Sequence, residues 1–380
     1  MLESGFNLTL AKGIYMKRIF LIGSAFIGII VGAGFASGQE ILQYFTSFGT
    51  AGILAGVVST VLFAYVGMML VWLGSKFKAE GHNDVIHKLT GGTVFGKVIA
   101  WLVDIVLIIA LFGFGVVMLA GGGSNFEQQF GIPAVYGTAL MVILVLLFGM
   151  LRVDSVVKVI GNITPLLIIC IIIVAIYCLF TMSGSFSELD TLAKSHKSAV
   201  PHWFIAGVNY VSLNVGLGAS MSIVMGGNER NSKVAAWGGL AGGFVLGLMI
   251  MVSHLAIFSK IETVGHLPLP MLGLVNDISP ILGVFMSIVV YLMIFNTCLG
   301  MFYSLATRFT EIETNQFKIF YTIFTLIGFV ISFAGFTDLM TFFYPVIGYM
   351  GIIIIIVLIY APFKMKRIKN KVNHFKICKG

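Results

Sequence analysis

Nine consecutive residues in the first apolar stretch, 32–40, combine groups that rarely occur together in a hydrophobic segment. Gly32, Gly34 and Gly38 each cost a helix about 1 kcal/mol relative to alanine. Glu40 ends the run, and a carboxylate in hydrocarbon costs about 2.5–3.5 kcal/mol. Irregular backbone at membrane depth is tolerated only where protein buries it or where it lines a watery cavity. The run therefore predicts a helix that is broken in order to hold something polar.

A second run of this kind lies in the other half of the chain, between Val208 and Gly227, where three polar side chains stand beside glycines. Two interrupted spans in matching halves indicate a transporter binding site. Close packing and hydrogen bonding between helices would use the same residue types, and they are the structural alternative. The predicted substrate-binding residues are Gly32, Ala33, Gly34, Ser37, Gly38, Asn209, Ser212, Asn214, Gly216 and Gly218.

The composition of the whole chain places both runs in a membrane protein. The 380 residues are 58% hydrophobic and only 10% charged, with a mean hydropathy of +1.04. Soluble domains do not have this composition, whereas long apolar runs are typical of helical membrane proteins. The net charge of +8 does not indicate nucleic-acid binding, because the charges lie in short loops and at the end of the chain. We expect an all-α integral membrane protein.

About ten apolar runs are long enough to cross a bilayer, which takes about 20 residues of helix. They cover residues 19–45, 51–75, 97–121, 133–151, 157–181, 202–226, 234–259, 279–306, 316–335 and 340–362. With this arrangement, 20 of the 23 Lys and Arg residues fall on the side of the two termini, and only Lys194, Lys197 and Lys260 fall on the other. Positive charge marks the cytoplasmic side. The sequence therefore predicts a multi-pass protein of the cell membrane with both termini in the cytoplasm.

The ten predicted spans divide into two halves of nearly equal length. Because five is odd, the second half enters the membrane from the opposite face, which makes an inverted 5+5 repeat. Gly32-Ala33-Gly34 matches Gly216-Leu217-Gly218 in the corresponding span. The predicted parts are a cytoplasmic tail (1–18), repeat 1 with spans 1–5 (19–181), an extracellular loop (182–201), repeat 2 with spans 6–10 (202–362), and a basic cytoplasmic tail (363–380) that contacts anionic lipid.

This layout resembles the LeuT-type fold of the amino acid–polyamine–organocation (APC) superfamily. Residues 210–219, Tyr-Val-Ser-Leu-Asn-Val-Gly-Leu-Gly-Ala, look like the unwound sixth helix of sodium-coupled amino acid symporters. Residues 28–34 are similar to their first helix, and the string 32–40 resembles a bacterial group described as amino acid permeases. The resemblance implies broken helices 1 and 6 and transport by alternating access.

The resemblance also implies a cation site between spans 1 and 8. By position, its candidate sodium ligands are Gly28, Val31, Asn296 and Thr297. The chain departs from the symporters at Phe35, where they have an amide residue, so a second sodium site is not expected. Glu40 offers proton coupling instead, because a low-dielectric cavity disfavours the charged form of a carboxylic acid. Glu40 could equally pair with a substrate ammonium or meet water at the outer end of its span.

Two features of span 3 have alternative interpretations. Asp104 could pair at the cytoplasmic edge or join an inner gate. Phe112 and Phe114 stand where the symporters use a tyrosine hydroxyl, so the resemblance implies a different recognition of the substrate. The glycine run 121–123 with Ser124 predicts a turn that ends the span.

No motif predicts an enzyme, a cofactor or a resident metal other than sodium. The four cysteines and seven histidines lack metal-ligand spacing, and no catalytic constellation occurs. The predicted function is secondary active transport of a small amino acid or related amine, coupled to H⁺ or Na⁺. The alternative is a permease-like receptor subunit of the germinant-receptor type, which would bind an amino acid and signal through partners.

Overall fold

The computed structural model is all-helical and describes residues 2–79, 84–85, 88, 94–150, 164–182, 184–312 and 314–377. The first apolar stretch forms α1 (Leu2–Ile30), α2 (Ala33–Ser37), α3 (Gln39–Tyr44) and the 3-10 turn η1 (Thr46–Phe48). The helices that follow are α4 (Ala51–Phe77), α6 (Val94–Phe130), α7 (Ala134–Gly149), α9 (Thr164–Phe180) and α10 (Phe186–Ser195). The rest of the chain forms α11 (Trp203–Gly227), α12 (Ser232–Ser259), α13 (Ile261–Val264), α14 (Pro270–Ile278), α15 (Pro280–Ala306), α16 (Asn315–Ser332) and α17 (Phe336–Ile377).

Seven helices within the described ranges are long and apolar enough to cross a membrane. They are α4, α6, α11, α12, α15, α16 and α17. The apolar helix α7 and the described apolar part of α9 are shorter, and residues 157–163 of the predicted fifth span lie outside the described residues. A chain with this many apolar helices of spanning length is a multi-pass membrane protein.

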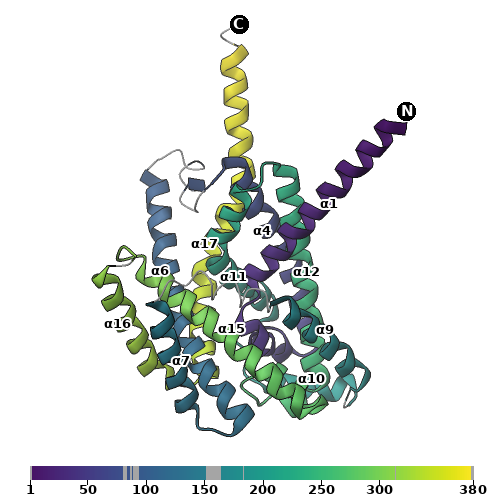
Figure 1. Cartoon of the computed structure of the whole chain (residues 1–380). Helices are drawn as coiled ribbons and strands as arrows, with labels where there is room; N and C mark the ends of the chain where they lie inside the picture. The colour runs from purple at the N-terminus through teal and green to yellow at the C-terminus, as the bar shows by residue number, and fades with distance from the viewer. Residues whose placement is uncertain are drawn as a thin grey trace.

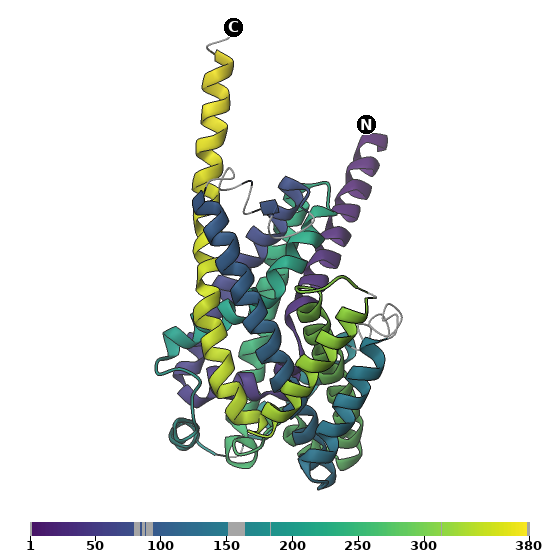
Figure 2. The same cartoon turned by 90° about the vertical axis from the view of Figure 1, so that its left-hand side faces the viewer.

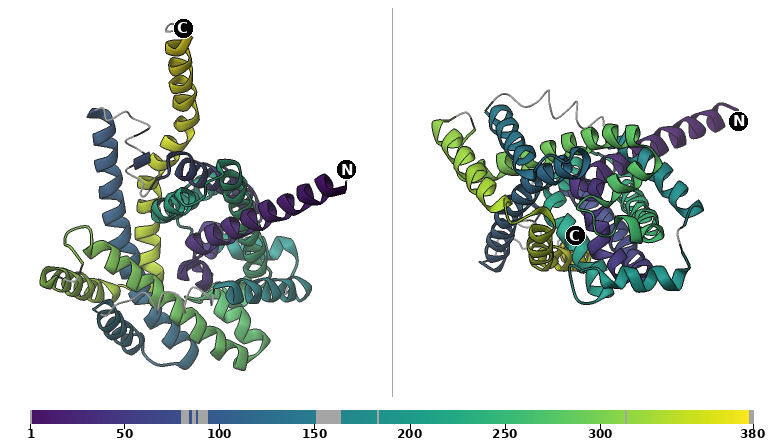
Figure 3. Two further views of the ribbon diagram at one scale, coloured as in Figure 1. Left: turned by 45° about the horizontal axis from the view of Figure 1, so that its top comes forward. Right: turned by 90° about the horizontal axis from the view of Figure 1, so that it is seen from below.

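Both ends of the chain project from the same end of the helix bundle (Figures 1 and 2). The N-terminal part of α1 leaves the bundle obliquely, apart from the C-terminal part of α17 (Figure 3). The opposite end of α1 lies deep in the bundle, where the chain continues into α2 and α3. The interrupted segment is therefore surrounded by the other helices.

Two groups of helices make most of their contacts within the group. The first group is α1, α4, α11 and α12, the second is α6, α7, α15 and α16, and α17 contacts both α11 and α6. In the first group, glycines allow backbones to lie close together. A Cβ added at Gly207 would lie 2.7 Å from the carbonyl oxygen of Ala55, and a Cβ added at Gly242 would lie 2.7 Å from the carbonyl oxygen of Gly23. Small residues allow membrane helices to approach in this way.

Two local features differ from the sequence predictions. The predicted turn at residues 121–124 is wrong, because α6 continues to Phe130. The glycines pack instead: Gly122 faces Met141, and an added Cβ at Gly123 would lie 2.6 Å from the Ala134 carbonyl oxygen of α7. The second feature is that the predicted extracellular loop contains the helix α10, which begins with a capping box at Ser185.

Candidate functional site

The helical path of the first segment is interrupted twice. Val31 and Gly32 are not helical, and Gly38 adopts a left-handed conformation with φ of 81°. A helix leaves its last four carbonyls without partners inside the helix. The Val31 N–H donates to the carbonyl of Ile27. The last three carbonyls of α1, those of residues 28–30, therefore have no helical partner. The first interruption therefore presents hydrogen-bond acceptors in the middle of the bundle.

Open space lies beside this interruption. An added Cβ at Gly32 would meet only the Thr297 hydroxyl of α15, at 3.9 Å. An added Cβ at Gly216 of α11 would meet nothing within 4 Å, although Gly216 is a buried residue. The interruption at Gly32 thus has room on the side that faces Thr297 of α15.

Two neighbouring polar side chains of α15, one of them beside Gly32, lack hydrogen bonds. Asn296 and Thr297 are half-buried, and neither side chain makes a hydrogen bond to any described residue. By contrast, the hydroxyls of Thr307 and Thr325 donate to backbone carbonyls of their own helices. The Thr297 hydroxyl therefore remains available to a ligand beside Gly32.

Glu40 lies in a buried cluster on the other side of the interruption, with only 5% of its surface exposed. The Tyr210 hydroxyl donates to Glu40 Oε2 at 2.9 Å. An added Cβ at Gly34 would lie 2.6 Å from Glu40 Cδ and 2.9 Å from the Tyr344 hydroxyl. The carboxylate thus occupies the room that a side chain at position 34 would fill, and Tyr344 lies beside it without a hydrogen bond of good geometry.

The predicted break in the sixth span is wrong. The helix α11 runs without interruption from Trp203 to Gly227. Two glycines cost a helix only about 2 kcal/mol in total, and packing offsets that cost. Gly218 provides the packing, since an added Cβ there would lie 2.6 Å from Ile30 Cδ1 of α1.

The polar side chains predicted for this break bond to protein groups instead. The Asn209 amide donates to the Pro345 carbonyl of α17 at 3.1 Å and its oxygen accepts from the Tyr44 hydroxyl at 3.0 Å. The Ser212 hydroxyl donates to the Gly348 carbonyl at 2.6 Å. Asn214 bonds within α11, to the Tyr210 carbonyl at 2.9 Å. These contacts correspond to the helix–helix hydrogen bonding that is the structural alternative.

Three other predicted binding residues have structural contacts in the first segment. The Ser37 hydroxyl donates to the Gly34 carbonyl at 2.7 Å and accepts from the Gln39 N–H at 3.2 Å. It therefore stabilises the left-handed turn at Gly38, which packs against Met271. Ala33 is 1% exposed within α2. Of the five glycines predicted to bind substrate, Gly32 and Gly216 are the two at which an added Cβ would meet no atom closer than 3.9 Å.

Several residues of the buried cluster were not selected in the sequence. Tyr210 and Tyr344 lie within apolar spans and give no spacing signal in the chain. The ring of Phe114, which replaces a tyrosine of the resembled symporters, stacks on Tyr344 with centroids 4.5 Å apart. That replacement predicted a different recognition of the substrate and gave no signal of Tyr344.

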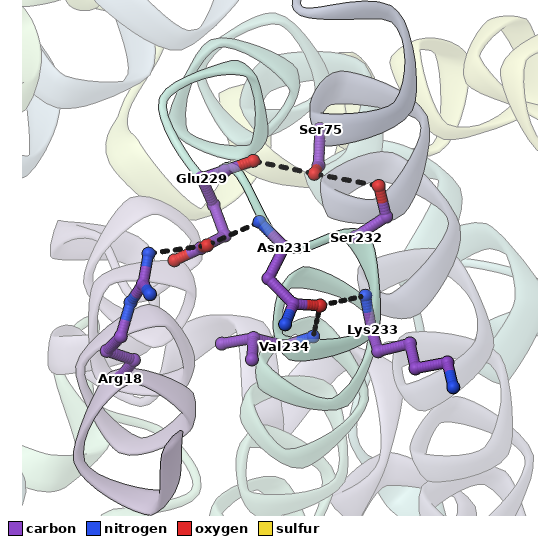
Figure 4. A network of polar contacts seen from close by, with 7 residues as sticks. All are labelled: Arg18, Ser75, Glu229, Asn231, Ser232, Lys233 and Val234. Atoms are coloured by element: carbon purple, nitrogen blue, oxygen red, sulfur yellow. Dashed lines mark hydrogen bonds and ion pairs between the residues drawn. The ribbon is translucent and has the colours of Figure 1, made fainter. Parts of the chain in front are cut away.

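Two ion pairs lie near the end of the bundle from which the termini project. Arg18 of α1 donates to Glu229 Oε1 at 2.6 Å, and the same carboxylate oxygen accepts from the Asn231 N–H at 2.7 Å (Figure 4). Asp104 of α6 pairs with Arg308 of α15 at 3.1 Å. Each pair joins elements of one helix group, so neither pair ties the two groups together.

No group of three or more metal-ligating His, Cys, Asp or Glu side chains occurs among the residues that the structure describes. The predicted sodium ligands are of another kind, namely carbonyls and uncharged side chains. Of these, the Thr297 hydroxyl of α15 lies beside Gly32, and Gly28 and Val31 lie at the end of α1 just before it in the chain.

No protein-family model matches the chain. The sequence is 27% identical to the membrane protein YkvI of Bacillus subtilis over 330 residues, which cover 86% of this chain and 91% of that protein. It is 24% identical to YyaD of the same organism over 352 residues, which cover 92% and 98%. These similarities extend over nearly the whole helical layout.

Solved structures with the same arrangement of helices include MhsT in complex with L-phenylalanine. That similarity has a TM-score of 0.61 and 17% identity, and covers 88% of this chain and 87% of MhsT. The similarity to inward-facing Mhp1 has a TM-score of 0.54 and 11% identity, and covers 88% of this chain and 73% of Mhp1. The similarity to a mutant manganese transporter of Eremococcus coleocola has a TM-score of 0.55 and 12% identity, and covers 92% of this chain and 79% of the transporter. The chain therefore has the LeuT-type fold that these proteins share.

Proposed function

We propose that this protein is a secondary active transporter that moves a small amino acid or related amine across the cytoplasmic membrane. The observation that carries the proposal is the interruption between α1 and α2, which faces open space and unbonded polar side chains of α15. Unpaired backbone groups are costly in a bilayer unless they line a cavity. The complex of MhsT with L-phenylalanine, a protein of the same fold, supports an amino acid as the substrate.

The substrate lies between the first interruption and Gly216. The last carbonyls of α1 carry partial negative charge and suit an ammonium group, while the first amides of α2 suit a carboxylate. Gly32, Ala33 and Gly34 supply backbone groups, and Gly216 supplies room. Asn209 and Ser212 contribute indirectly, since their bonds to α17 hold α11 in place.

Glu40 is the proposed coupling group. It is a buried carboxylate that contacts α11 and α17 through tyrosines, so its charge state affects the contacts between three segments. A proton is the smallest ligand that neutralises it. The second candidate is sodium, because the Thr297 hydroxyl is unbonded and faces Gly32. Its other ligands are Asn296 and the carbonyls of residues 28 and 31.

Transport proceeds by alternating access, in which the two helix groups rock against each other around the site. We further propose ten spans in an inverted 5+5 repeat, with residues 19–181 and 202–362 as the repeats and both termini in the cytoplasm. Cysteines introduced near Lys197 and Gly265 are then expected to label from outside the cell, and cysteines near Lys88 and Lys318 are not. Labelling near Lys88 from outside contradicts the inverted repeat.

The function is tested by uptake into proteoliposomes. The purified protein is offered the standard amino acids and simple amines one at a time, under an imposed proton gradient, an imposed sodium gradient, or neither. We expect accumulation of at least one amino acid, dependent on one of the gradients. Gly216→Leu is the negative control: its side chain fills the proposed substrate space, so we expect no uptake. Saturable binding without uptake under any gradient contradicts transport and favours the receptor alternative.

A further inference from the structure

We propose that a polar ladder between α3 and α17 is the route by which protons reach Glu40 from the outer side, separate from the substrate path. The ladder consists of Glu40 and Gln43 on α3 and of Thr337, Thr341 and Tyr344 on α17. This inference rests on the proposed role of Glu40 as the coupling group. It assigns a function to polar contacts between α3 and α17 that the proposed substrate site does not use.

The two helices form the ladder because of their register. Residues 337, 341 and 344 follow i, i+4, i+7 spacing and share one face of α17, and residues 40 and 43 are one turn apart on α3. One rung is the bond from Gln43 Nε2 to Thr341 Oγ1, at 3.0 Å. The other rung is Glu40 beside the Tyr344 hydroxyl. From residue 337 to residue 344 the helix rises about 10 Å.

Two atoms of the ladder are buried without hydrogen-bond partners. The Thr341 hydroxyl donates to the Thr337 carbonyl at 2.8 Å, so it accepts from the Gln43 amide. This fixes the orientation of Gln43 and leaves its Oε1 buried without a donor. The Tyr344 hydroxyl is the second such group. Buried polar groups that lack protein partners are normally satisfied by ordered water, and each of these two can accept a hydrogen bond from water.

The outer end of the ladder reaches the surface. Thr337 and Thr341 are half-buried, and Asp338 next to them is exposed. Lys197 of the segment after α10 lies 3.8 Å from Asp338, and the Ala199 N–H donates to the Gln43 carbonyl at 3.0 Å. The proton enters beneath this segment, passes along water and the hydroxyls of Thr341 and Tyr344, and binds one carboxylate oxygen of Glu40. Each hydroxyl accepts one proton and releases another, the Thr341 O–H first turning away from the Thr337 carbonyl, so only Glu40 changes its charge.

The other groups that face Glu40 do not offer an alternative path. Tyr210 donates its hydroxyl to the carboxylate from α11. The Tyr44 hydroxyl is committed to Asn209. Among the described residues, no ion pair of Glu40 with a Lys or Arg side chain is found. Among the described residues, the ladder is a polar connection that leads from Glu40 toward the exposed Asp338.

The test follows protonation itself and needs no substrate. Liposomes that contain the full-length protein are acidified on the outside only, and infrared spectroscopy follows the rise of the carboxylic acid band that Glu40→Gln lacks. We expect Thr341→Val and Gln43→Leu to slow this rise about tenfold, and Thr341→Ser to restore it. Thr325→Val is the matched control, because Thr325 is a buried threonine that also bonds the carbonyl four residues earlier; it keeps the wild-type rate.

Wild-type rates in both Thr341→Val and Gln43→Leu overturn the ladder, as does a carboxylic acid band that Glu40→Gln leaves unchanged. The proposed function fails separately, in the uptake assay. If the two variants protonate Glu40 slowly but still accumulate substrate normally under a proton gradient, the ladder is not the route used in transport. Slow protonation in the two variants, together with sodium-driven uptake, upholds the route and overturns only the choice of coupling ion.

Discussion

The first and sixth predicted spans contain similar runs of glycine and polar residues, yet they fold differently. In the first, helix ends at Ile30 and again at Ser37, whereas α11 continues through Gly216 and Gly218. The difference lies in what satisfies the polar groups. Ser37 bonds the backbone on both sides of its turn, which stabilises a break. Asn214 bonds the carbonyl four residues earlier, which is compatible with continuous helix.

This comparison shows that a glycine-rich polar run permits a break but does not impose one. A glycine in the first segment, Gly34, provides room for the Glu40 carboxylate. A glycine in the sixth span, Gly218, provides room for the apolar side chain of Ile30. The same residue type therefore supports an internal polar site in one span and ordinary helix packing in the other.

The largest expected effect comes from filling the two kinds of glycine site. Gly34→Leu displaces Glu40 and Tyr344, so we expect no uptake and a loss of about 1–3 kcal/mol of stability from overpacking. Gly216→Leu points into open space, so we expect no uptake but unchanged thermal stability. Uptake into proteoliposomes and thermal unfolding in detergent check both variants.

Each outcome of this pair is informative about the comparison. Wild-type uptake in Gly216→Leu would mean that the space beside α11 does not hold substrate. Wild-type stability in Gly34→Leu would mean that the cluster around Glu40 yields easily to a new side chain. Gly300→Leu is a further control, since position 300 also faces open space but belongs to the other helix group.

The next largest effect is expected for Glu40→Gln, which keeps the shape of the side chain and removes its titration. We expect the loss of gradient-driven accumulation, with exchange of labelled for unlabelled amino acid within about threefold of wild type. The measurement is uptake and exchange in the same proteoliposomes. Normal accumulation that follows a sodium gradient at fixed pH would assign the coupling to the site at Thr297.

Much of the fold follows from the hydrophobic pattern. All ten predicted apolar runs contain helix in their described residues, and the run at residues 32–40 contains the second interruption and Gly32 of the first. The continuous α11 could not be predicted, because the partners of Asn209 and Ser212 lie on α17, more than a hundred residues away. Local composition does not reveal which helix a polar side chain will face.

The cluster around Glu40 was predictable only in part. Its carboxylate stands out in an apolar span, whereas Tyr210 and Tyr344 are ordinary residues of such spans. They become informative only when the fold brings α3, α11 and α17 together. The short helices α10 and α14 were likewise concealed, because ten and nine residues do not make a long apolar run.

A smaller effect is expected for Asn209→Ala, which tests whether α11 binds substrate directly. The Asn209 side chain bonds Tyr44 and Pro345, so its loss should lower stability by about 0.6–1.7 kcal/mol. We expect the substrate concentration at half-maximal uptake to stay within about twofold of wild type. A large rise in that concentration at unchanged thermal stability would instead make Asn209 a ligand of the substrate, as the sequence predicts.

The smallest expected effect concerns the ion pairs near the termini. Arg18 joins α1 to the connection between α11 and α12, and its side chain is 42% exposed, so solvent screens the pair. A half-exposed pair contributes about 0.5 kcal/mol, which changes an equilibrium about twofold. The α1 helix ends at the proposed site. A thiol reagent added on the inner side is therefore expected to label a cysteine at position 28 about twofold faster in Arg18→Gln than with Arg18 present.

Arg308→Gln is the matched control for this prediction, because its pair with Asp104 lies between α6 and α15 and does not contact α1. It should leave the labelling rate at position 28 unchanged. High salt should reduce the difference between wild type and Arg18→Gln, since screening weakens exposed charge pairs. If both variants speed labelling equally, the inner end of α1 is not held by Arg18, and the interrupted span moves independently of the pair that Figure 4 shows.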